Sequence, residues 1–194
     1  MKRNIQTITV QDLIILGICF IFYFFIFLIV VHMAVMLTPL TYPFISVFLA
    51  LFEGVVYLLL VTKAPKFGII TIFSVLLSVT IMLFGHGSYV LIGPIFGCSA
   101  DLVLKNHHRQ WKYQILSYAI FSLWVMSITI QLYLFVDAFN RDPTFAKMGT
   151  KFTQSVMQVM SVWNLPIVLI TTLLGAVLGI YWGRTILHKV SVLK

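Results

Sequence analysis

The sequence predicts an all-α integral membrane protein with six transmembrane helices, and three observations lead to this fold class. Hydrophobic residues make up 61% of the 194 residues, charged residues only 9%, and the mean hydropathy is +1.06. Five acidic and thirteen basic side chains are too few to cover a water-soluble fold of this size. The charged residues separate long apolar runs that lack the alternation of barrel strands, so helices are expected.

Charges, prolines and glycines divide the chain into six apolar segments, each close to the roughly 20 residues that a helix needs to cross a bilayer. The first segment is interpreted as a retained span. Its uncharged run is too long for the core of a signal peptide, and no cleavage pattern follows it. The expected spans are 11–32, 41–61, 67–85, 88–105, 113–136 and 163–184, in a single polytopic domain, 1–194.

The distribution of lysine and arginine predicts the orientation. The outer side would hold only three of the thirteen basic residues, all in the connection after the fifth span. With an even number of spans, both the N- and the C-terminus are expected in the cytoplasm. The basic residues assigned to the inner side are Lys2, Arg3, Lys63, Lys66, Lys105, Arg109, Lys112, Arg184, Lys189 and Lys194.

The connection at 137–162 is the longest segment expected outside. Phe152, Val156, Val159 or Met160, and Trp163 recur in it at helical spacing between polar residues. This pattern predicts a short amphipathic helix that lies on the outer surface.

Polar and aromatic side chains in the outer half are the candidate substrate contacts. His86 lies between two glycines that allow a tight turn and close approach to a ligand, although a turn histidine that faces water fits the same pattern. The aromatic members also fit an interfacial belt. Two outer histidines, His86 and His32, could in principle ligate haem iron, so haem is a conceivable transported ligand. The remaining candidates are Tyr89, Trp124, Gln131, Asp137, Trp163 and Asn164.

Two acidic residues fall within predicted spans. Glu53 lies inside the second span, where an ionisable group is costly and normally faces the protein interior or an aqueous cavity. Glu53 is therefore a candidate for function, with an internally bonded acid, partnered by Tyr57 one turn on, as the structural alternative. Asp101 precedes Lys105 by four residues, and this order predicts an ion pair at the inner boundary.

Small residues recur every four positions in two spans. Gly175, Gly179 and Gly183 share one face of the sixth span, and Gly93 and Gly97 repeat the spacing in the fourth. Such spacing lets helix backbones approach closely, so these glycines are expected at helix contacts, with partner contact as the alternative.

The sequence contains no nucleotide-binding loop, metalloprotease motif, paired CxxC or nucleophile elbow. An enzyme is therefore disfavoured, and no cofactor or metal site is predicted. The net charge of +8 is scattered between apolar runs and forms no basic stripe, which argues against nucleic acid as a partner.

Six segments, in this order and at these spacings, resemble the Trep_Strep family. They read DLIILGICFIFYF, TKAPKFG, GHG, GPIFGCSADLVLK, YAIFSLW and TLLGAVLGIYWGRTILHK. The family is identified with S components, the substrate-capturing membrane subunits of energy-coupling factor (ECF) transporters. The resemblance implies a six-helix protein of the bacterial plasma membrane that binds a vitamin-like or other scarce nutrient outside, in a pocket in its outer half. It also implies association with a transmembrane T subunit and two ABC-type ATPases, and delivery of the substrate by toppling of the S component.

One departure from the resemblance concerns the partner interface. Many S components have alanines four apart in the first span, whereas this chain offers Gly17 and Cys19, followed by bulky side chains. Two rival functions stay open. One is a self-sufficient proton-coupled transporter that uses Glu53, and the other is a membrane enzyme or a purely structural partner.

Overall fold

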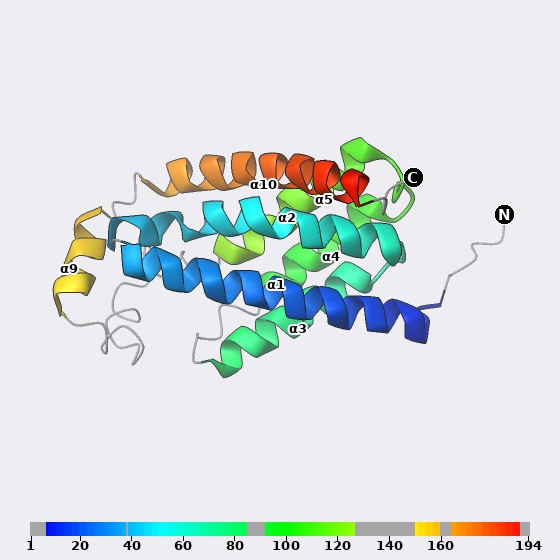
Figure 1. Ribbon diagram of the computed structural model, residues 1–194, viewed down its shortest axis with the longest axis horizontal. Helices are drawn as coiled ribbons and strands as arrows, with labels where there is room; N and C mark the ends of the chain where they lie inside the picture. The colour runs from blue at the N-terminus through cyan, green and yellow to red at the C-terminus, as the bar shows by residue number, and fades with distance from the viewer. Residues whose placement is uncertain (1–6, 38, 85–91, 127–149, 160–163, 191–194) are drawn as a thin grey trace.

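The computed structural model describes residues 7–37, 39–84, 92–126, 150–159 and 164–190 (Figure 1). Seven α-helices and no strand lie within these ranges, so the prediction of an all-helical chain is confirmed for them. The α-helices are α1 (Val10–Leu37), α2 (Ile45–Lys63), α3 (Ile69–Leu83), α4 (Gly93–Leu104), α5 (Trp111–Ser122), α9 (Thr150–Val159) and α10 (Asn164–Lys189). Two 3-10 helices, η1 (Pro39–Phe44) and η3 (Leu123–Val125), precede α2 and follow α5.

Three helical segments are long and apolar enough to cross a membrane: Val10–Ala34, Thr41–Lys63 and Asn164–Lys189. The other three predicted spans coincide with shorter described helices, of 15 residues in α3, 12 in α4 and 12 in α5. The expected spans 67–85, 88–105 and 113–136 extend into residues that the structure does not describe. All six predicted spans thus contain a helix, and three of them are described over a membrane-spanning length.

The long helices lie side by side along the longest dimension of the molecule (Figure 1). α10 packs on α2, α1 on α2, α3 on α4 and α4 on α5. α1 begins and α10 ends at the same end of the bundle, while α9 lies at the opposite end. We call these the basic end and the far end; the basic end is defined by Lys63, Lys66, Lys105, Arg109, Lys112, Arg184 and Lys189.

Glycines allow the closest helix contacts of the bundle. A Cβ atom added to Gly179 of α10 would lie 2.5 Å from the carbonyl oxygens of Ala50 and Leu51 on α2. One added to Gly54 of α2 would lie 2.5 Å from the Gly179 backbone, so the two glycines face each other. The other glycines predicted at helix contacts also meet a neighbouring helix: Gly175 and Gly183 face Val47 and Val55 of α2, and Gly93 and Gly97 face Ser78 and Ser74 of α3.

The amphipathic helix expected after the fifth span is present as α9. Val156 is fully buried, whereas Gln154 and Gln158 on the other face are exposed. α9 packs against η1 at the far end and runs across the direction of the long helices (Figure 1). Its position agrees with the prediction of a helix that lies on a membrane surface.

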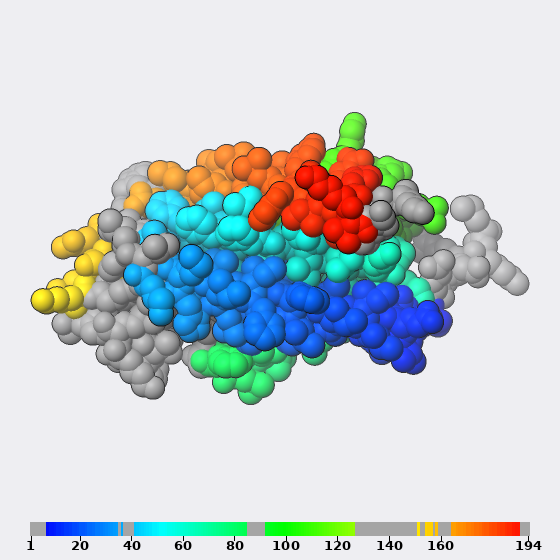
Figure 2. All heavy atoms as spheres, viewed as in Figure 1, coloured from blue at the N-terminus to red at the C-terminus, as the bar shows by residue number. Residues whose placement is uncertain are grey.

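Apolar side chains cover the outside of the bundle between its two ends. α1 forms a continuous ridge along the face shown in Figure 2. Its exposed large residues are Val10, Leu13, Ile14, Ile18, Ile21, Phe22, Phe25, Ile29, Met33 and Met36. Such a surface is expected of helices that face lipid, because lipid tails solvate apolar side chains.

The predicted ion pair between Asp101 and Lys105 is wrong. The Asp101 carboxylate accepts hydrogen bonds from the backbone N–H of Thr71 at 2.7 Å, from the Thr71 hydroxyl at 2.6 Å and from the N–H of Ile70 at 3.4 Å. Lys105 instead lies over the Phe67 ring, 5.1 Å from its centroid. The first turn of α3 has backbone N–H groups without helical partners, and the carboxylate on the neighbouring helix caps them.

Candidate functional site

Glu53 is the centre of the candidate site. It lies on α2 and is 0% exposed. Neither carboxylate oxygen has a hydrogen-bond partner among the described residues. A buried ionisable group in a membrane-spanning segment is costly and usually marks a ligand, ion or proton site. The sequence prediction that Glu53 faces the protein interior is therefore confirmed.

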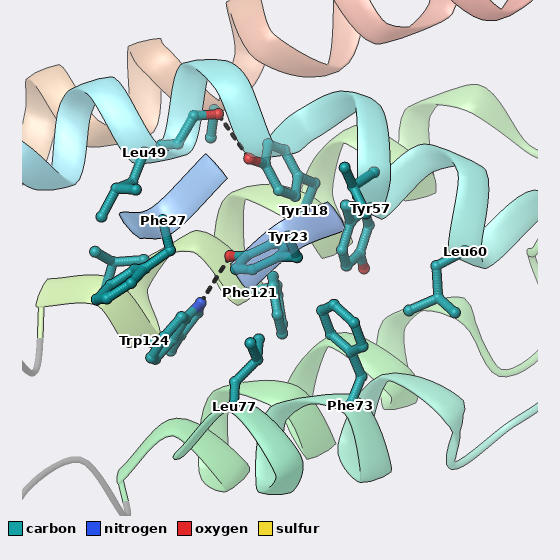
Figure 3. Packing of buried hydrophobic residues seen from close by; sticks show 14 of the residues in the cluster. Tyr23, Phe27, Leu49, Tyr57, Leu60, Phe73, Leu77, Tyr118, Phe121 and Trp124 are labelled. Atoms are coloured by element: carbon teal, nitrogen blue, oxygen red, sulfur yellow. Dashed lines mark hydrogen bonds between the residues drawn. The ribbon is translucent and has the colours of Figure 1, made fainter. Parts of the chain in front are cut away.

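Aromatic side chains from four helices and one 3-10 turn pack in the same part of the core (Figure 3). Tyr23 of α1 makes edge contacts with Phe73 of α3 at 5.2 Å and with Phe121 of α5 at 6.1 Å between ring centroids. Tyr57 of α2 lies 4.8 Å from Tyr118 of α5. We define the aromatic cluster as Tyr23, Tyr57, Phe73, Tyr118, Phe121 and Trp124, all 0% or 1% exposed.

The polar tips of the cluster are hydrogen-bonded to protein groups. The Trp124 indole N–H donates to the Tyr23 hydroxyl at 3.0 Å, and the Tyr118 hydroxyl donates to the Ala50 carbonyl at 2.6 Å (Figure 3). The Tyr57 hydroxyl lies 2.6 Å from the Ser117 hydroxyl. Ser117 donates its own proton to a backbone carbonyl, so Tyr57 is the donor of this pair. The proposed partnership of Tyr57 with Glu53 is therefore wrong.

Tyr23 connects Glu53 to Trp124. Its hydroxyl accepts from the indole, which leaves its own proton for another acceptor. Tyr23 and Tyr118 both lie close enough to Glu53 to interact with it electrostatically. The carboxyl and the Tyr23 hydroxyl approach each other without the geometry of a formed hydrogen bond. Glu53 is thus an acid in an apolar, aromatic environment, and its carboxylate oxygens accept no hydrogen bond from the described residues.

The profile of the Trep_Strep family, described as a hypothetical bacterial integral membrane protein, matches residues 10–190. The chain belongs to the Trep_Strep family. Searches of characterised proteins and of solved structures gave no match.

In this Trep_Strep chain, the structure brings together two of the predicted substrate contacts. Glu53 lies beside the aromatic cluster that contains Trp124: Tyr23 accepts from the Trp124 indole and interacts electrostatically with Glu53. His32 lies on an exposed part of α1 near the far end, where its Nδ1 donates to the Leu28 carbonyl at 2.7 Å. Asn164 is the first residue of α10. The other predicted contacts lie outside the described residues and stay predictions: His86, Tyr89, Gln131, Asp137 and Trp163.

The two residues predicted at a partner interface have different environments. A Cβ atom added to Gly17 would meet nothing within 4 Å, so this position faces open space on α1. Cys19 is 1% exposed and packs inside the bundle. Within this chain, Gly17 is therefore the member of the pair that a partner can reach.

Tyr23 and Tyr118 were not among the residues predicted for the site. Tyr23 follows an uninterrupted apolar run, where its hydroxyl is the first polar side-chain group after Cys19. A hydroxyl in a membrane span requires an internal partner, and this signal points to Tyr23. Tyr118 follows Ser117 in a similar apolar context, but its acceptor, Ala50, is 68 residues away in sequence and has no local signature.

The basic end contains a separate polar cluster. Lys66 forms an ion pair with Asp12 at 2.7 Å and donates to the Thr7 carbonyl at 2.8 Å. The Thr9 hydroxyl and N–H both donate to Asp12, as in a capping box. In the nearby turn between α4 and α5, burial lowers the pKa of His108. These contacts fix the start of α1 to the turn between α2 and α3.

Proposed function

We propose that this chain is the substrate-binding S component of an ECF-type ATP-driven importer. It captures a vitamin-like or other scarce nutrient from outside and delivers it by toppling in complex with a T subunit and two ABC-type ATPases. The observation that carries the proposal is the combination of family membership over residues 10–190 with a buried, unpartnered acid in an aromatic cluster. Ligand sites are mostly apolar and contain a few polar groups that fix the ligand, and this composition matches the cluster.

Sequence motifs and the distribution of charge support a complex in which this chain binds the substrate and other subunits hydrolyse ATP. The sequence contains no phosphate-binding loop, so ATP hydrolysis has to take place in other chains. Among the described residues, the charged side chains between the two ends of the bundle are buried ones, Glu53 and Asp101. A body with an apolar girdle loses little solvation when it rotates in lipid, which favours toppling.

Purification of the tagged chain from its native membrane in mild detergent tests the assignment. We expect a transmembrane T subunit and ABC-type ATPases to copurify, and uptake of the bound molecule to stop when ATP is depleted. The matched variant Gly17→Leu adds a bulky side chain at the predicted partner contact, an open position of α1, without a clash inside the bundle, and should reduce copurification of the T subunit while the chain still folds. Purification of the chain without an ATPase, together with uptake that persists without ATP, would contradict the proposal.

Glu53 also supports a second function, a self-sufficient proton-coupled transporter. An intramembrane acid without a bonded partner is the group that such a transporter loads and unloads with a proton. This function predicts uptake by the chain alone in proteoliposomes, abolished by a protonophore and by Glu53→Gln. Uptake that requires added ATPase subunits and persists with a protonophore would exclude it.

A further inference from the structure

We infer that the substrate carries a positively charged nitrogen, which Glu53 and the ring faces of the aromatic cluster bind together. This inference rests on the proposed function and names the class of its substrate. The ligand class is an organic cation, either a quaternary ammonium, a protonated amine or a cationic aromatic ring.

Glu53 has no counter-charge near it among the described residues. Glu53 is fully buried and both of its oxygens lack a hydrogen-bond partner among the described residues. The described lysines and arginines lie at the two ends of the bundle, and the ion pair found among them joins Lys66 to Asp12 at the basic end. Intramembrane acids normally face a partner of opposite charge. Because the described chain does not provide this partner near Glu53, a bound cation is the natural candidate.

The surroundings of Glu53 suit an organic cation better than a metal ion. Metal cations such as Ca²⁺ need six or more oxygen ligands, and Mg²⁺ needs near-octahedral oxygen coordination. The hydroxyls of Tyr57 and Tyr118 already donate to Ser117 and Ala50, and the Tyr23 hydroxyl accepts from Trp124. No group of three His, Cys, Asp or Glu side chains within the described ranges is placed to hold a metal ion. Glu53 and the aromatic cluster together offer one carboxylate and several ring faces. This combination suits a cation with low hydration.

The rings of the aromatic cluster are themselves groups that attract a cation. A cation within about 6 Å of a ring centroid is attracted by the negative face of the ring, most strongly by tryptophan and tyrosine. Tyr23 lies 6.3 Å from Trp124 and 6.1 Å from Phe121, and Tyr57 lies 5.1 Å from Phe121. These ring-to-ring distances are those of direct packing, so a cation can enter only when the rings move apart, and it would then contact more than one face (Figure 3).

The cluster also has an element that can admit a ligand. Regular α-helix ends at Ser122, and Trp124 lies on the 3-10 turn η3 before helical geometry resumes at Met126. A short 3-10 stretch within a helix often marks a hinge. Since α5 begins at the basic end, Trp124 lies on the side of the cluster nearer the far end, which is the proposed entry side. Rotation of η3 would move the indole away from Tyr23 without unwinding α5.

Thermal unfolding of the purified full-length chain with matched probes tests the inference. The probe pairs are choline with 3,3-dimethylbutan-1-ol, and 1-methylnicotinamide with nicotinamide; each pair has nearly the same shape, and only the first member is charged. We expect at least one cation to raise the unfolding midpoint and its neutral counterpart to leave it unchanged. Glu53→Gln should weaken the binding of this cation by at least about tenfold, because one unit of charge pairing is lost.

Two variants control for the fold. Asp12→Asn removes a carboxylate at the basic end and should keep the midpoint shift produced by the cation. Trp124→Leu keeps an apolar side chain but removes a ring face. It should weaken the binding of the cation and leave the helix content unchanged. The inference fails if neither cation shifts the midpoint, if neutral counterparts act equally, if Glu53→Gln binds as tightly as the native chain, or if sodium alone reproduces the shift.

The inference and the proposed function fail separately. If ATPases copurify and drive uptake while no organic cation binds, the substrate class is wrong and the S-component assignment stands. If an organic cation binds through Glu53 but its uptake needs no ATPase, the site stands and the importer assignment is wrong.

Discussion

Glu53 and Asp101 are two buried carboxylates in the same bundle, and their surroundings differ in one respect. Asp101 accepts three hydrogen bonds from Thr71 and Ile70 at the start of α3, whereas Glu53 accepts none from the described residues. Both are 0% exposed. Burial alone therefore does not separate a structural acid from a functional one, and the count of satisfied oxygens does.

The difference has a physical cause in helix geometry. Asp101 of α4 faces the N-terminus of α3, where backbone N–H groups are free and the helix dipole favours negative charge. Glu53 faces the middle of neighbouring helices, where backbone groups are already paired within each helix. A carboxylate at a helix start can be part of the fold, while one at mid-helix needs a partner from elsewhere.

The largest expected effect on stability is that of Asp101→Ala. This change leaves the N–H groups of Thr71 and Ile70 without an acceptor, which costs roughly 1–3 kcal/mol of unfolding free energy. Denaturant-induced unfolding in detergent micelles measures the loss. Asp101→Asn retains an acceptor oxygen and should lose less. Stability of Asp101→Ala equal to that of the native chain would break the comparison.

Glu53→Gln should have the opposite profile. It removes no hydrogen bond that the described residues make and replaces an ionisable group by a neutral one of the same shape, so the unfolding free energy should fall less than in Asp101→Ala. Binding of the substrate should weaken by about tenfold or more, which corresponds to about 1.4 kcal/mol. Unfolding and binding measured on the same preparation check both halves. A large loss of stability with unchanged binding would assign Glu53 to the fold.

Tyr23→Phe should have an intermediate effect. It removes the acceptor of the Trp124 indole N–H, at a cost of about 0.5–1.5 kcal/mol in unfolding free energy. Because Tyr23 also interacts with Glu53, binding should weaken as well. Tyr118→Phe is the matched comparison: the Tyr118 hydroxyl already donates its proton to Ala50, whereas the Tyr23 hydroxyl accepts from Trp124 and keeps its proton for another acceptor, so Tyr118→Phe should weaken binding less than Tyr23→Phe. Equal effects of the two variants on binding would remove the special role of Tyr23.

The smallest effect is expected at the basic end, for Asp12→Asn. The Asp12–Lys66 pair lies at the edge of the bundle, where ion pairs contribute about 1 kcal/mol or less. The difference from the native chain should shrink further in high salt, because salt screens such pairs. Unfolding at low and high ionic strength checks this. A loss of unfolding free energy as large as that of Asp101→Ala would show that the start of α1 contributes more to stability than its contacts indicate.

The sequence was sufficient for features that depend on one helix. Composition and apolar run length predicted helices, the helical spacing from Phe152 to Trp163 predicted α9, and the position of Glu53 within an apolar run predicted an interior acid. Such features follow from the spacing of apolar residues along one helix or from the cost of a charge in lipid.

The small-residue spacing predicted which glycines lie at helix contacts, but the partners of polar side chains on other helices could not be predicted. The expected partners of Asp101 and Glu53 were residues four positions away, since spacing within a helix is all that the sequence displays. The actual partners of Asp101 are 30 and 31 residues away, and the Ser117 partner of Tyr57 is 60 residues away. Helix packing determines which of these contacts form. Gly54 and Gly179, for example, allow α2 and α10 to approach closely.

Native mass spectrometry of the complex purified from its own membrane tests the central claim most directly. The account predicts a particle that contains this chain, a T subunit, two ATPases and one small organic cation, and predicts that the Glu53→Gln complex has the same proteins without the cation. A chain that is released without ATPases and without any bound small molecule would contradict the account.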